Sequence, residues 1–265
     1  KKKYLIINKL KNSKKKINKY NKKKYNKCDE TYNGNDNQTI YQIIYDYGGE
    51  DLHMCLNNKK IIYKKIFFNL INIFEKIFIL SKKNYIHLDV RPPNILYNKK
   101  NNKSKLIDYG FLIKKHDLYK KEYNYIINSV HHNYPPEFTK HNYKILLNNL
   151  IRTLNRVIVN NKNFNKFKRF KYIMDYLFNN ENKLELKQEI NKDKIDIYML
   201  GVSLLVILIE YEIVNRSKLT DKEFYLIFNF IKKLIDINIK NRYTPIQALN
   251  EYKKIISNNK KNNTP

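Results

Sequence analysis

The residues of this sequence best suited to chemistry lie in the octapeptide HLDVRPPN at 87–94 and in the tripeptide DYG, which begins fourteen residues after Asn94. The Asp89 carboxylate can orient an acceptor hydroxyl, and the oxygens of Asn94 and Asp108 are hard ligands of the kind that hold Mg²⁺ beside phosphates. Arg91 offers a cation to offset charge on a transferred phosphate. These residues predict phosphoryl transfer. The catalytic residues would be Asp89, Arg91 and Asn94, and the metal ligands Asn94 and Asp108.

Three histidines and a glycine near these residues have simpler interpretations. Gly110, the last residue of the tripeptide, lets the backbone turn sharply beside a metal. His87 is interpreted as a packed, hydrogen-bonded scaffold residue rather than as an acid or base. His131 and His132 have no cysteine or carboxylate pattern around them, so a loop is a better interpretation than a metal site.

Several regular elements are expected to position these residues. The segment 39–47 is rich in β-branched and aromatic residues and predicts a strand that ends at Gly48 and Gly49. Residues 61–80 place apolar side chains at spacings of three and four, which predicts one long amphipathic helix. Small strands are predicted by the short apolar runs at 85–88, 95–97 and 106–107.

The second half of the chain is expected to be almost wholly helical. Residues 143–191 predict helices with polar breaks, and the apolar run within 196–211 predicts a buried core helix. A capping box of Thr220 and Glu223 opens the next helix. The last helix is opened by Thr244, Pro245 and Gln247.

This order of motifs resembles the eukaryotic protein-kinase family, whose catalytic loop reads H-R-D-L-x-x-x-N and whose metal loop reads D-F-G. The tract YDYGGEDL at 45–52 looks like the family's hinge between lobes, and YPPEF at 134–138 looks like the end of its activation segment. DIYMLGV at 196–202 is similar to the family's central buried helix, and NRYTP at 241–245 to its late arginine motif. Together these motifs span most of the chain after residue 40.

The resemblance implies an α+β protein-kinase-like fold, with a mostly helical C-terminal lobe and a truncated or divergent N-terminal β lobe. It also implies ATP and magnesium as cofactors. The residues implied at the nucleotide are Tyr45, Tyr47, Asn94 and Asp108.

Two structural contacts are implied by the same resemblance. Glu137 is expected to pair with Arg242, because a buried charge requires a partner. Asp196 is expected to bond the backbone of the catalytic loop. His87 and Gly110 complete the set of residues with structural roles.

Domain boundaries follow from the positions of these motifs. The segment 1–47 is expected to be an N-lobe remnant with a Lys-rich stretch, 48–257 the C-lobe, and 258–265 a disordered tail. Asp196 follows Glu137 by 59 positions, more than is usual in the family. The excess, 141–191, is expected to be a helical, basic insertion outside the catalytic core. It would pack on the lower lobe and bind an acidic partner or present a docking surface, with plain support of the fold as the alternative.

Some positions depart from the family pattern. No glycine-rich loop and no strand lysine of the V-A-I-K type is recognisable before Tyr45. Leu88 stands where the family has the arginine that binds a phosphate on the activation segment, so control by phosphorylation of that segment is not expected. Arg91 stands where serine/threonine kinases have a lysine, which weakens the prediction of the acceptor.

Three functions fit these residues. The first is a serine/threonine protein kinase that moves the γ-phosphate of ATP to hydroxyls of protein substrates, favoured by intact Asp89, Asn94 and Asp108. The second is a pseudokinase, a binding scaffold without catalysis, favoured by the unrecognised upper-lobe motifs. The third is a phosphotransferase acting on a small molecule. Its match would end after Asp108, whereas this chain continues into the PPE tract and Asp196.

Composition limits the partners and the compartment. The 53 Lys and Arg against 24 Asp and Glu leave a net charge of +29, but it is spread over Lys-Asn runs, so nucleic acid is possible without a specific signal. The aromatic and basic tract 163–171 suits base stacking or an ordinary surface helix. Cys28 and Cys55 are too few for a disulfide framework and favour an intracellular, cytoplasmic location. No secretory signal is expected, because no apolar segment with a cleavage site follows the Lys-rich N-terminus. No membrane span is expected, because the apolar run 198–209 is shorter than the roughly 18 residues that a span needs.

Overall fold

The computed structural model describes residues 47–56, 58, 60–128, 130–158, 164–181, 189–214 and 216–261. The chain divides between Tyr47 and Gly48 into two units. Only Tyr47 of the first unit is described, so the strand expected at 39–47, the Lys-rich stretch and Tyr45 lie outside the described residues. All other described residues belong to the second unit, which begins at Gly48.

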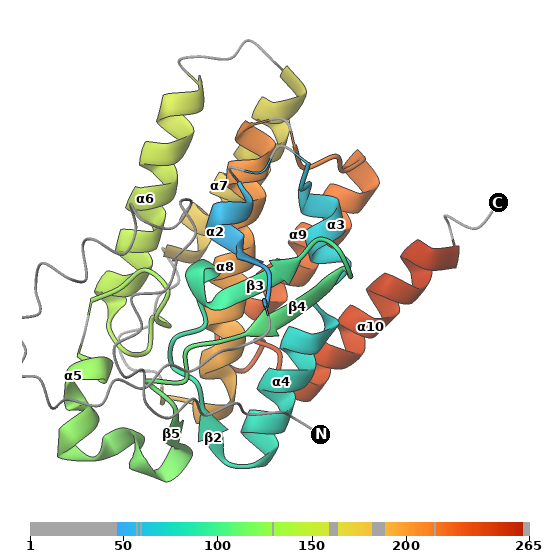
Figure 1. The fold of residues 1–265 in the computed structure, drawn as a ribbon. Coiled ribbons are helices and arrows are strands. Elements are labelled where there is room, and N and C mark those ends of the chain that lie inside the picture. Colours follow the sequence, from blue (N-terminus) through green and yellow to red (C-terminus); the bar gives the residue numbers. More distant parts are fainter. Residues whose placement is uncertain are drawn as a thin grey trace, which may run out of the picture. The chain divides into compact units, whose positions relative to one another are not determined.

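Helices dominate this unit, and two small antiparallel sheets make its class α+β, as expected (Figure 1). The three-stranded sheet has the order β1 (Glu50–Asp51), β3 (Ile95–Asn98) and β4 (Lys103–Leu106). The second sheet pairs β2 (Tyr85–Ile86) with β5 (Ile113–Lys114). Both sheets are formed by the short segments around the candidate site, so their main effect is to fix loops.

The centre of the core is α8 (Ile195–Ile213), which lies in the middle of Figure 1. The expected buried helix at 196–211 is confirmed, and its apolar residues occupy all sides because the helix is enclosed. Gly201 allows a close approach to α9 (Asp221–Leu234), since a Cβ there would lie 2.6 Å from Leu234 Cβ and from Ile235 Cγ2. A larger residue at this position would push the two helices apart.

The single helix expected at 61–80 is wrong in one respect, because the structure has α3 (Tyr63–Phe67) and α4 (Ile71–Lys82) with a break between them. The hydroxyl of Tyr252 occupies the break. It donates to Phe67 O at 2.5 Å and accepts from Leu70 N at 2.9 Å. A buried side chain thus satisfies backbone groups that a continuous helix would have paired internally.

Helix α10 (Pro245–Lys261) runs alongside α4 (Figure 1). The Thr244 N–H donates to Gln247 Oε1 at 2.9 Å, and the capping box of Thr220 and Glu223 before α9 is present, so both expected helix starts are confirmed. Residues 258–261 continue α10, which corrects the tail expected from 258. Asn258 lines a small cavity together with residues at the start of α9.

The expected insertion is helical where it is described, as α6 (Lys140–Ile158) and α7 (Phe164–Glu181). The Tyr143 hydroxyl of α6 donates to Leu177 O of α7 at 2.9 Å. Arg169 of α7 pairs with Glu212 of α8 at 2.8 Å. Both helices contribute to the same hydrophobic core as α8 and α9, through Tyr143, Leu146, Leu147, Leu150, Phe170, Ile173 and Leu177. Their apolar faces are therefore core, whereas the insertion itself and its acidic partner stay predictions.

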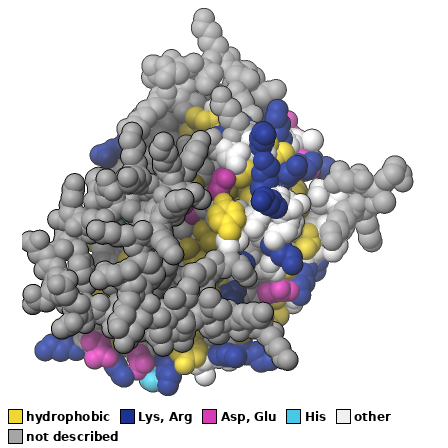
Figure 2. All heavy atoms as spheres, viewed as in Figure 1, with side chains coloured by type: hydrophobic (Ala, Val, Ile, Leu, Met, Phe, Trp, Pro, Cys, Tyr) yellow, Lys and Arg dark blue, Asp and Glu magenta, His cyan; other side chains and the backbone are white. Residues whose placement is uncertain are grey.

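Short elements complete the unit. They are α2 (Leu52–Cys55), α5 (Asn124–Ile127) and the 3₁₀ turns η1 (Pro92–Asn94), η2 (Lys115–Tyr119), η3 (Lys121–Tyr123) and η4 (Lys192–Lys194). Within the described ranges no helix is long and apolar enough to cross a bilayer. Figure 2 shows Lys and Arg side chains spread among polar and hydrophobic ones over the described part of one face.

Candidate active site

The β3–β4 hairpin brings the two predicted metal ligands to one end of one element. Ile95 lies opposite Leu106 in the register, and one step further Ile107 N donates to Asn94 O at 3.0 Å. Asn94 ends η1 just before β3, and Asp108 follows Ile107. The two residues are fourteen positions apart in sequence. The hairpin brings them together, because Asp108 directly follows Ile107, the residue that is hydrogen-bonded to Asn94.

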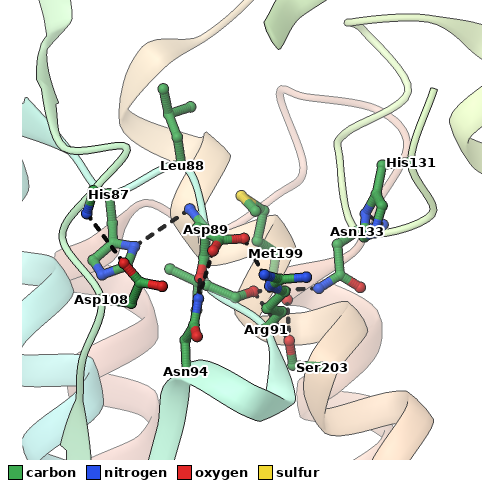
Figure 3. Close-up of polar contacts among 12 residues, drawn as sticks. His87, Leu88, Asp89, Arg91, Asn94, Asp108, His131, Asn133, Met199 and Ser203 are labelled. Atoms are coloured by element: carbon green, nitrogen blue, oxygen red, sulfur yellow. Dashed lines mark hydrogen bonds and ion pairs between the residues drawn. The ribbon is translucent and has the colours of Figure 1, made fainter. Parts of the chain in front are cut away.

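Asn94 is locked onto Asp89 by both hydrogens of its amide. Its Nδ2 donates to Asp89 Oδ2 at 2.6 Å and to Asp89 O at 3.0 Å (Figure 3). Because both partners are acceptors, the amide nitrogen must face Asp89, and this determines the orientation of the amide. The Asn94 Oδ1 oxygen receives no hydrogen bond from a described residue, so it is left as a free acceptor.

Arg91 contacts the other oxygen of the same carboxylate. Its Nε lies 2.9 Å from Asp89 Oδ1, and 41% of its side chain is exposed. Asp89 is therefore held from two sides, by Asn94 on one oxygen and by Arg91 on the other. The arginine links the buried carboxylate to solvent.

Two residues of the site have backbone conformations that non-glycine residues rarely adopt. Leu88 has φ 62° and Asp108 has φ 59°. Such conformations cost about 1–3 kcal/mol each and cluster at functional sites. At Asp108 the turn is tightened by its own Oδ1, which accepts from Gly110 N at 3.3 Å. The Asp108 side chain stays exposed, so a ligand can reach it.

Asp196 at the start of α8 supports the strained loop. Its Oδ2 accepts from His87 N at 2.8 Å, and its Oδ1 accepts from Leu88 N at 3.0 Å. The expected bond from Asp196 to the catalytic-loop backbone is thus confirmed. Burial raises the pKa of the Asp196 carboxyl, while the charge of His87 and the two backbone N–H groups oppose that shift.

His87 has the geometry of a scaffold residue. It is fully buried, its Nδ1 accepts from Asp89 N at 3.3 Å, and its ring lies against Tyr109 at 4.9 Å between centroids. Its Nε2 is buried and has no hydrogen-bond partner in the described part of the chain. The ring therefore shapes the loop around Asp89 from inside.

The second expected structural contact is also present. Arg242 grips Glu137 through two hydrogen bonds of 2.6 and 3.0 Å, and both side chains are fully buried. The Arg242 Nε donates to Asp236 O at 2.9 Å, and the guanidinium lies over the Tyr198 ring at 4.7 Å. The pair ties the end of the loop before α6 to the region between α9 and α10.

His131 and His132 form a stacked pair with ring centroids 4.4 Å apart. His131 Nδ1 accepts from the backbone N–H of Asn133 at 3.2 Å, which makes it a turn residue. Burial, followed by the charges of His131 and Arg91, lowers the pKa of His132 to about 4. Among the described residues no group of three or more His, Cys, Asp or Glu side chains is placed to hold a metal ion.

Two residues that contact the backbone of the catalytic loop were not predicted from the sequence. Asn133 Nδ2 and Ser203 Oγ both donate to Val90 O, between Asp89 and Arg91. Ser203 could have been noticed as a hydroxyl within an apolar run, whereas Asn133 has no distinguishing signal in an Asn-rich chain. Tyr47, expected near the nucleotide, is described and is 67% exposed.

Comparison with known proteins does not assign a family: no family model and no curated protein matches this chain.

Proposed function

We propose that this chain carries the catalytic lobe of a protein-kinase-like phosphotransferase, which moves the γ-phosphate of ATP to serine or threonine hydroxyls of protein substrates. The observation that supports the proposal most is the arrangement of Asn94. Its amide nitrogen is committed to Asp89, and its backbone bond to Ile107 brings Asp108 alongside. A hydroxyl-orienting carboxylate and two oxygen ligands thereby adjoin one another, as phosphoryl transfer requires.

Asp89 would accept a hydrogen bond from the acceptor hydroxyl and orient it for attack. Its two oxygens are already fixed by Asn94 and Arg91, so the carboxylate is positioned before substrate arrives. Arg91 would offset charge on the transferred phosphate, because its guanidinium adjoins the carboxylate and is partly exposed. Removing either side chain should affect the transfer step more than nucleotide binding.

The donor set of the site fits Mg²⁺. The free Oδ1 of Asn94 and the exposed carboxylate of Asp108 are oxygen ligands, the kind that this ion prefers. When bound, the ion would neutralise phosphate charge. The protein contributes the fixed orientation of Asn94 and the tight turn at Asp108. In this turn a Cβ added to Gly110 would lie 3.3 Å from Asp108 Oδ1, so a glycine fits best.

A binding scaffold without catalysis is the second candidate. It is favoured by the absence of a recognisable glycine-rich loop or strand lysine before Tyr45. A small-molecule phosphotransferase is less well supported, because the Glu137–Arg242 pair lies beyond the point where such a resemblance would end, and the pair is formed.

The test is transfer of labelled γ-phosphate from ATP in the presence of Mg²⁺. Peptide pools with serine and threonine, pools with tyrosine only, and small-molecule alcohols are supplied separately. Label in the serine and threonine pool supports the proposal, and label only in small molecules favours the third function. Binding of Mg²⁺-ATP without transfer would favour the scaffold. Asp108→Asn is the matched variant, and it should weaken Mg²⁺-dependent nucleotide binding.

A further inference from the structure

We infer that Asn133 is a positioning residue that couples the loop at 130–137 to the catalytic loop, an inference that rests on the proposed function. The contact that carries it is made with the carbonyl of Val90. This carbonyl lies between Asp89 and Arg91, the two residues that flank the reacting groups in the proposed mechanism. Whatever holds it also sets where both side chains emerge.

Two donors from different elements reach this carbonyl (Figure 3). Asn133 Nδ2 approaches Val90 O at 3.5 Å from the loop at 130–137, and Ser203 Oγ approaches it at 3.1 Å from α8. A residue of the rigid core helix and a residue of a surface loop thus converge on one atom of the catalytic loop.

The hydroxyl of Ser203 cannot hold the carbonyl by itself. It carries a single hydrogen, and it lies 2.8 Å from Met199 O as well as 3.1 Å from Val90 O. Bonding to the carbonyl four residues earlier is a common alternative for a serine within a helix. The amide of Asn133 has no such competing acceptor among the described residues, so it is the donor that can be committed to Val90.

Asn133 is also buried in a way that packing alone does not explain. Its exposed fraction is 1%, and its Oδ1 is buried with no hydrogen-bond partner in the described part of the chain. Leaving a buried acceptor unpaired costs free energy, so an apolar residue would stabilise this position better. The remaining Nδ2 contact with Val90 gives the amide a role in placing the catalytic loop.

Loss of the Asn133 side chain should affect phosphate transfer more than nucleotide binding. Asn94 and Asp108 are fixed by the β3–β4 hairpin, and the hydrogen bonds of Asn133 among the described residues go to His131 and Val90 instead, so nucleotide binding should not depend on Asn133. Asp89 and Arg91 should shift when the Val90 carbonyl is released. Misplacement of reacting groups by about 1 Å can cost a factor of about 100 in rate.

Asn142 provides a matched control. It is fully buried, its Oδ1 accepts from His131 N at 2.8 Å, and its Nδ2 donates to Pro135 O at 3.4 Å. It therefore supports the same loop as Asn133, and its side-chain hydrogen bonds among the described residues stay within that loop. A purely structural effect of loosening the loop should appear in both alanine variants.

The experiment compares Asn133→Ala with Asn142→Ala by steady-state kinetics and by amide hydrogen exchange. Asn133→Ala should lower kcat at least about 10-fold with KM for ATP unchanged within about twofold, and it should raise exchange at 87–91. Asn142→Ala should change exchange within 130–142 and leave kcat within about twofold. If Asn133→Ala does not fold, Asn133→Ser replaces it, because a serine hydroxyl is too short to reach Val90.

Exchange at 87–91 also separates this inference from the proposed function. If the wild-type chain transfers no phosphate but Asn133→Ala alone raises exchange there, the coupling stands and the proposed activity fails. Equal effects of the two variants on kcat, or unchanged exchange at 87–91 in the Asn133 variant, would overturn the inference.

Discussion

Asp196 accepts a hydrogen bond of 3.0 Å from the backbone N–H of Leu88, a buried leucine with φ 62°. A left-handed conformation at such a residue costs roughly 1–2 kcal/mol, so the surrounding contacts must hold it. The second oxygen of the carboxylate secures His87 in the same way. The core helix α8 thereby determines the conformation from which Asp89 projects.

Asp196→Ala should therefore lower the free energy of unfolding by about 3 kcal/mol, because two buried N–H groups lose a charged acceptor. Asp193→Ala is the control. Its side chain is 51% exposed and pairs with Lys115, so its loss should cost under about 1 kcal/mol. Urea unfolding of the two variants measures both values. Similar losses would show that Asp196 does not support the strained loop.

Arg242→Ala should destabilise the chain by about 3–5 kcal/mol, since it leaves Glu137 buried without its partner. Adding Glu137→Gln should recover part of that loss. A double-mutant cycle from denaturant unfolding gives the coupling energy between the two side chains. If the losses of unfolding free energy in the two single variants simply add in the double variant, Arg242 and Glu137 have no coupling energy and the ion pair does not stabilise the fold.

Tyr252→Phe should cost about 1–3 kcal/mol, because the hydroxyl that joins Phe67 O to Leu70 N is removed from a buried site. Tyr211→Phe is the matched control. That hydroxyl is buried without a hydrogen-bond partner in the described part of the chain, so its removal should be neutral or stabilising. Thermal melting of both variants distinguishes them, and equal shifts in Tm would contradict the role of Tyr252 at the break.

His132 should make stability depend on pH below neutrality. Its pKa is lowered from 6.5 to about 4 in the folded chain, so between these values the unfolded chain binds more protons. The stability it contributes is present above pH 6.5 and is lost as pH falls toward 4. His132→Gln should flatten this part of the profile relative to the wild-type chain, because it removes the group whose pKa differs between the folded and unfolded states. Unfolding midpoints at pH 7.5 and 4.5 provide the comparison.

The predictable parts of this structure are those in which local pattern and burial agree. A helix as apolar on all sides as α8 is stable only when other elements bury it, so its position in the core could be predicted. The capping residues of α9 and α10 could be predicted because each contacts a residue within one turn of the helix. The Glu137–Arg242 pair was predictable only through the family resemblance, because nothing local links residues 105 positions apart.

The remaining features depend on tertiary contacts that no local pattern reports. The break between α3 and α4 is set by the hydroxyl of Tyr252, far along the chain, although the apolar spacing continues across it. Asn133 became recognisable only when folding brought it to the Val90 carbonyl. The left-handed conformation of Leu88 likewise depends on a carboxylate more than a hundred residues away.

In the proposed function, Asp89 orients the hydroxyl that receives the phosphate. The most direct measurement is the rate of γ-phosphate transfer to serine and threonine peptides by the wild-type chain, Asp89→Asn and Asp175→Asn. Asp175 serves as the control, because it is an exposed carboxylate whose ion pair among the described residues is with Lys171, one turn earlier in the same helix. The account predicts that Asp89→Asn lowers kcat by about 10²–10⁴ and that Asp175→Asn leaves it unchanged. Transfer by Asp89→Asn at the wild-type rate, or no transfer by the wild-type chain, would contradict it.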